Sequence, residues 1–131
     1  MEHLGDVDHL MKSEIVKDFM DEAQDDIVGL WEVINEARDR LGASAAGLKG
    51  ASLEIVGLML EAGFVAGDPP YSAGGYRPWP VQDRAYVLDR IDREWQALGR
   101  EPNIPDIAWF DFPEVRRGQG QASSPPDGTE A

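Results

Sequence analysis

Apolar side chains recur every three or four residues along two long stretches of this chain, which predicts two amphipathic helical segments. In residues 13–41 these positions are Val16, Phe19, Met20, Ala23, Ile27, Leu30, Trp31, Ile34, Ala37 and Leu41. An unbroken helix of that length would reach about 42 Å. Because this is long for a small domain, we expect a break near residues 24–26. Ser13 is the expected N-cap of the first helix, and Asp25 or Asp26 that of the second.

The second periodic stretch covers residues 81–98. Its apolar positions are Val81, Ala85, Leu88, Ile91, Trp95 and Leu98. Pro80 precedes it and suits the first turn of a helix, whereas Gly99 suits its end. The intervening charged residues balance in sign, so we expect this helix to present a surface of weak salt bridges.

Between the two stretches lies a segment, residues 52–79, around which we expect the rest of the chain to pack. Residues 52–62 are apolar over most of the helical circumference and carry only Glu54 and Glu61 as charges. Such a helix is normally buried on more than one side. Ser52 is its expected N-cap and Gly63 its expected left-handed stop.

Two short β-prone runs follow that helix, residues 64–66 and residues 76–79. Glycine, proline and serine dominate the sequence between them, which predicts a hairpin. Pro78 has no N–H to donate, so the returning strand is predicted to lie at a sheet edge or to end there. A third β-prone run, residues 107–112, predicts a C-terminal strand beside the hairpin.

These elements predict an α+β fold, namely a small helical domain with a β-hairpin and a third C-terminal strand. We divide the chain into an N-terminal arm (residues 1–12), one globular domain (13–113) and a disordered tail (114–131). The tail is rich in glycine, serine and proline, and it cannot bury enough apolar surface to offset the entropy of ordering.

The helix that leads into a ribbon with a Gly/Pro-rich tip resembles the third helix and wing of a winged helix-turn-helix domain. The resemblance covers roughly residues 25–79 and is architectural, without a residue signature. It implies DNA binding, but a reading helix needs basic and polar side chains directed at the groove. Residues 53–62 contain no base, Lys49 alone precedes them, and the wing offers only Arg77. We therefore expect protein contact, with a winged-helix DNA-binding transcriptional regulator as the alternative.

Charge is the most informative part of the composition. The chain has 25 acidic and 12 basic residues, a net charge of −13. Residues 13–41 hold nine acids against three bases, whereas residues 80–100 hold four of each. An acidic field disfavours nucleic acids and anionic membranes and favours a basic partner. An acidic surface also promotes solubility. Like charges at this density destabilise a helix, however, so solubility is not the only explanation for them.

The sequence lacks the residues that several classes of catalytic and metal-binding site require. The chain has no cysteine, and its two histidines, His3 and His9, lie near the start of the chain. No metalloprotease, serine-hydrolase or phosphate-loop motif is present. We therefore predict no enzymatic activity, no cofactor and no metal site. Since the sequence has neither an apolar run long enough to cross a bilayer nor a signal-peptide pattern, we expect a cytoplasmic protein without membrane contact.

The leading hypothesis is a non-enzymatic, acidic protein-binding module that neutralises or regulates a basic partner, such as a nuclease or a nucleic-acid-binding protein. In charge and size, but in no motif, the chain is similar to immunity proteins, antitoxins and nucleic-acid-mimicking inhibitors. The predicted partner-binding residues are Asp18, Asp21, Glu22, Asp25 and Asp26. A homodimer through the apolar helix stays open. Trp31, Trp79, Trp95 and Trp109 are predicted as core residues, with a tryptophan-lined pocket as the alternative.

Overall fold

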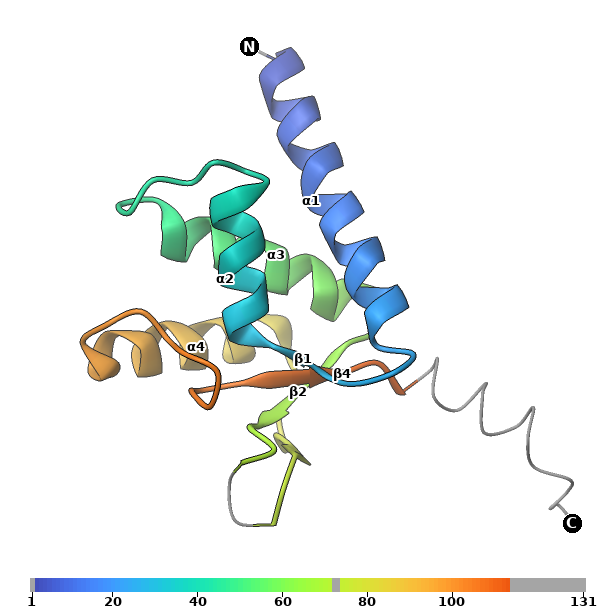
Figure 1. Ribbon diagram of the computed structural model, residues 1–131, viewed down its shortest axis with the longest axis vertical. Helices are drawn as coiled ribbons and strands as arrows, with labels where there is room; N and C mark the ends of the chain where they lie inside the picture. The colour runs from blue at the N-terminus through green and yellow to red at the C-terminus, as the bar shows by residue number, and fades with distance from the viewer. Residues whose placement is uncertain (1, 72–73, 114–131) are drawn as a thin grey trace, which may run out of the picture.

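The computed structural model describes residues 2–71 and 74–113, with side chains from residue 7 onward. Its helices are α1 (Glu2–Glu22), α2 (Leu30–Asp39), α3 (Leu48–Ala62) and α4 (Arg84–Leu98). Its strands are β1 (Val28–Gly29), β2 (Val65–Asp68), β3 (Arg77–Pro78) and β4 (Trp109–Asp111). They form one antiparallel sheet in the order β1-β4-β2-β3, so the predicted α+β class is confirmed (Figure 1). None of the helices in the described residues has the length and apolar character needed to span a membrane.

Helix α3 is the centre of the helical layer and contacts α1, α2 and α4. It is buried on more than one side, as its sequence predicts, through Leu48, Ile55, Val56 and Met59. It ends at Gly63, whose φ of 117° is the expected left-handed stop and whose N–H donates to the carbonyls of Met59 and Leu60. Phe110 from the sheet is fully buried in the same core.

The predicted hairpin and third strand are both present. Strands β2 and β3 pair in antiparallel register, with Gly67 opposite Pro78, and β3 lies at the sheet edge as proline requires. Strand β4 pairs with β2 on its other side, with Ala66 opposite Phe110. The hairpin therefore continues the sheet outward, away from α2 and α3 (Figure 1).

Strand β1 was not predicted. The apolar residues of 27–30 continue the helical spacing of their neighbours, so periodicity cannot separate a two-residue strand from a helix there. The strand forms because Val28 lies opposite Phe110 and Gly29 opposite Trp109 on β4. The break near residues 24–26 is real, but neither Asp25 nor Asp26 is the N-cap of α2. That position belongs to Gly29, whose N–H is bound by the Glu32 carboxylate 3.1 Å away.

Three other predicted helix starts are wrong. Helix α1 begins at Glu2, so Ser13 lies within it, and residues 2–12 form its first half. Helix α3 begins after Gly47, and Ser52 is a buried helical residue whose hydroxyl donates to the Leu48 carbonyl. Helix α4 begins at Arg84 because Asp83, not Pro80, supplies the cap to Tyr86 N–H. The predicted tail, residues 114–131, lies outside the described residues.

Candidate protein-binding surface

The five predicted partner-binding residues lie on one exposed region at the end of α1 and in the turn after it. We call Asp18, Asp21, Glu22, Asp25 and Asp26 the acidic face. All five side chains are exposed. Asp18 is bound by Arg40 of the α2 C-cap at 2.6 Å. Within the described residues, no cation lies within salt-bridge distance of the other four members of the face.

The position of the acidic face is electrostatically unfavourable for the isolated domain. Helix α1 ends at Glu22, and the last turn of this helix contains no basic residue. Because the C-terminal end of a helix carries a partial negative charge, carboxylates there are repelled rather than stabilised. The turn that follows is closed by backbone hydrogen bonds to the carbonyls of Asp21 and Glu22, which keep the acidic side chains in one small region.

Glu32, in the first turn of α2, extends the acidic face and was not predicted as part of it. Its carboxylate interacts with the Glu22 carboxyl group, and Asp26 adds further negative charge nearby. The hydrogen bond with Glu32, followed by desolvation and the charges of Glu32 and Asp26, raises the pKa of Glu22 to about 8. Glu22 therefore keeps a proton at neutral pH, because two adjacent carboxylates cannot both ionise cheaply.

Replacing Glu22 with glutamine is expected to stabilise the domain only at alkaline pH. The folded-state pKa of Glu22 lies above its ordinary value of 4.5, so the native state loses stability as pH rises from about 4.5 to about 8. Because the site is exposed and screened, we expect a gain of about 1 kcal/mol above pH 8 and none near pH 4.5. Urea unfolding of the wild type and of E22Q, between about pH 4.5 and above pH 8, measures this difference in the free energy of unfolding.

The control is the E22Q substitution made in a protein that already carries E32Q. Glutamine can still accept the Gly29 N–H bond, but the repelling carboxylate is gone. The gain from E22Q should then largely disappear at alkaline pH. A gain of equal size at both ends of the pH range would contradict the shared-proton explanation.

Trp31 is only half-buried, so its prediction as a core residue is wrong. It lines a pocket of about 380 Å³ together with Asn35 and the segment from Glu101 to Pro105. One edge of its indole lies against Gly29, where an added Cβ would be 2.6 Å from Trp31 Cδ1. Among the other tryptophans, Trp79 and Trp109 are buried and Trp95 is half-buried against the core. No sequence motif marks this pocket, because its two walls come from segments about 70 residues apart.

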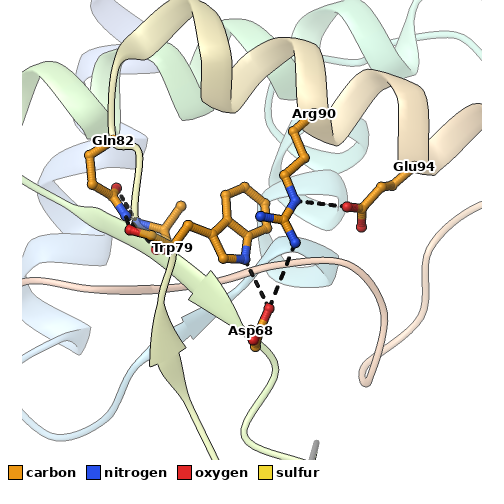
Figure 2. Close-up of polar contacts among 6 residues, drawn as sticks. Asp68, Trp79, Gln82, Arg90 and Glu94 are labelled. Atoms are coloured by element: carbon orange, nitrogen blue, oxygen red, sulfur yellow. Dashed lines mark hydrogen bonds and ion pairs between the residues drawn. The ribbon is translucent and has the colours of Figure 1, made fainter.

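A polar cluster joins the hairpin to α4 (Figure 2). The guanidinium of Arg90 lies 3.7 Å from the ring centre of Trp79, whose Nε1 donates to Asp68 at 3.0 Å. Arg90 also binds Glu94 at 2.8 Å. The Gln82 side chain bonds both the N–H and the carbonyl of Ala66 on β2, at 2.9 and 2.8 Å. The cluster is internally satisfied, so we assign it to holding the sheet on α4.

The described residues also contain histidine and carboxylate side chains, the types that ligate metal ions. No group of three or more histidine, aspartate or glutamate side chains among them is placed to hold a metal ion. Comparisons of the chain with protein-family models, curated proteins and solved structures found no match. The acidic face and the Trp31 pocket are therefore the two surface features that suggest a function.

Proposed function

We propose that this chain is a non-enzymatic protein-binding module whose acidic face binds a basic protein. The observation that carries the proposal is the group of carboxylates at the negative end of α1, where one glutamate keeps its proton because of its acidic neighbours. This arrangement costs the free domain stability. A lysine- or arginine-rich surface would relieve that cost on binding.

The overall charge supports the same conclusion. A net charge of −13 on 131 residues attracts a basic protein over distances beyond direct contact and speeds its association. A partner with a basic cleft, such as a nuclease or a nucleic-acid-binding protein, has the complementary field. Neutralising or regulating such a partner is therefore the role that we propose.

A winged-helix DNA-binding regulator remains the second candidate, because α3 leads through Gly63 directly into the β2–β3 hairpin. The charges on α3 weigh against it. The exposed charged residues of α3 are Glu54 and Glu61, which bind Lys12 of α1 and Arg84 of α4. Lys49 is also paired, with Asp92 at 2.6 Å. Such a helix would place carboxylates, or cations that are already paired, against the phosphates of DNA.

Neutralising the acidic face is expected to slow association with the partner about tenfold, because peripheral charges act mainly on the association rate. The face variant is D21N/D25N/D26N. Asp18 is kept because it binds Arg40, and Glu22 is kept because it already holds a proton at neutral pH. Wild-type and variant baits would be compared for capture from the native host at about 0.15 M salt, with and without nuclease. Association rates would then be measured with the purified partner.

The matched control is D39N/D83N/D89N, which neutralises three exposed acids outside the acidic face. Asparagine at position 83 can still cap α4, and Asp89 pairs only with the exposed Arg93. Each variant removes three negative charges and changes the formal net charge from −13 to −10. A basic partner retained by the wild type and the control, but lost or slowed with the face variant, supports the proposal. Equal effects of the two variants contradict it, and capture that depends on nucleic acid favours the DNA-binding alternative.

A further inference from the structure

We propose that the Trp31 pocket receives an aromatic side chain of the same basic partner and anchors it beside the acidic face. This inference depends on the proposed function for the identity of the partner. The pocket, of about 380 Å³, is large enough for one ring, since ligand pockets start at about 300 Å³. Aromatic residues are also over-represented among the side chains that dominate protein interfaces.

The walls of the pocket are mainly apolar. The indole of Trp31 forms one side, and Pro102, Ile104 and Pro105 contribute to the other. Ile104 is 45% exposed, an unusual position for a large aliphatic side chain. A ring inserted here would contact both the indole and the rigid proline surfaces, and aromatic pairs gain attraction beyond simple burial.

The charged residue that lines the pocket, Glu101, is already paired, and so are the charged neighbours of its segment. Arg38 binds Glu101 at 2.6 Å, and Arg100 binds Asp106 at 2.8 Å. The rim is therefore locally neutral, so it offers no unpaired carboxylate for a cationic side chain. An uncharged aromatic group is the occupant that this arrangement favours.

The pocket and the acidic face are linked at the first turn of α2. Trp31 forms a pocket wall, and the next residue, Glu32, interacts with Glu22 of the acidic face. Because a standard interface covers about 800 Å² on each partner, one partner surface can reach both regions. The acidic face would attract the basic surface, and the pocket would slow its dissociation, as buried anchors do at other interfaces.

The segment that forms the second wall is held in a fixed shape. Trp109 Nε1 donates to the carbonyl of Ile104 at 3.0 Å, and Asp106 accepts from the N–H of Asn103 at 2.7 Å. Ile107 has a φ of 65°, in the left-handed region that β-branched residues avoid. Strained residues of this kind persist where the surrounding contacts impose them, frequently at binding sites. A pocket shaped in advance binds a ring without the entropic cost of ordering the segment.

The first experiment titrates the full chain with N-acetyl-phenylalanine amide and follows the indole N–H signals by NMR. We expect the Trp31 signal to move, whereas that of Trp79, which is bound to Asp68, should not. The matched probes are the N-acetyl amides of leucine, alanine and arginine. The I104S variant should weaken phenylalanine-probe binding about fivefold through lost apolar contact. The control, V81S, changes a side chain of nearly equal exposure, 44%, outside the pocket.

Failure of this inference differs from failure of the proposed function. No shift of Trp31, equal binding of the leucine or arginine probe, or equal effects of I104S and V81S would overturn the aromatic anchor. If the acidic-face variant still loses the partner, the proposed function survives that result. With the purified partner, I104S should raise the dissociation rate and leave the association rate unchanged. Equal dissociation rates of the partner from the wild type and from I104S would also overturn the inference.

Discussion

Replacing Trp79 with alanine should lower the free energy of unfolding by about 3–5 kcal/mol, the range for large aromatic residues removed from a core. Trp79 is 3% exposed, packs under the guanidinium of Arg90 and donates to Asp68. The substitution leaves a cavity between the hairpin and α4, and it removes the ring that Arg90 covers. Urea unfolding followed by circular dichroism measures the effect.

Phenylalanine at position 79 is the informative control. It keeps most of the buried apolar surface but cannot donate to Asp68, so its cost should be about 1.5–3 kcal/mol, that of one hydrogen bond to a charged group. A loss below about 1 kcal/mol for the alanine variant would mean that the cluster of Figure 2 does not hold the hairpin.

Replacing Gln82 with leucine should cost about 2–3 kcal/mol. The leucine side chain has similar size but can make none of the bonds to Ala66, and the Trp79 carbonyl loses its 2.8 Å bond as well. The Ala66 carbonyl keeps the Trp79 N–H at 2.9 Å, but the Ala66 N–H loses its Gln82 acceptor. A buried donor left without an acceptor costs about 1–3 kcal/mol. Denaturant unfolding again provides the measurement.

Gln96 on the exposed side of α4 provides the matched control, since Q96L makes the same chemical change at an exposed position. Its effect should stay within about 0.5 kcal/mol. If Q82L and Q96L are equally mild, the Gln82 amide is not a structural part of the sheet.

These two predictions also separate stability from binding. Trp79 and Gln82 act on the hairpin and α4, whereas the acidic face lies at the junction of α1 and α2. Mild substitutions in the hairpin cluster should therefore leave partner binding intact as long as the domain remains folded. Neutralising the acidic face should have the opposite profile and reduce binding without a loss of stability.

Local chemistry in the sequence determined much of the fold. Gly63 and Gly99 end their helices with the positive φ values that glycine tolerates, and Pro78 lies at the sheet edge because it lacks an N–H. The apolar circumference of residues 52–62 indicated a helix buried on several sides. The exposure of the acidic residues could also be predicted from the sequence, because charged residues off the apolar stripe of a helix need no tertiary partner. All five residues of the acidic face are exposed, and their role in binding stays a prediction.

Only the tertiary structure decided the features that depend on distant segments. Strand β1 exists because Val28 and Gly29 meet β4, and no local periodicity distinguishes those residues from the helices around them. Ser13 and Ser52 have the chemistry of caps, but both lie inside longer helices. Packing extends α3 past Ser52, because Leu48 is buried and burial outweighs the roughly 1 kcal/mol of a cap. Trp31 has the spacing of a core residue, yet it lines a pocket because the segment from Glu101 to Pro105 folds against it. Periodicity reports which side chains share a helix face, and the partner that covers this face is fixed only when the chain has folded.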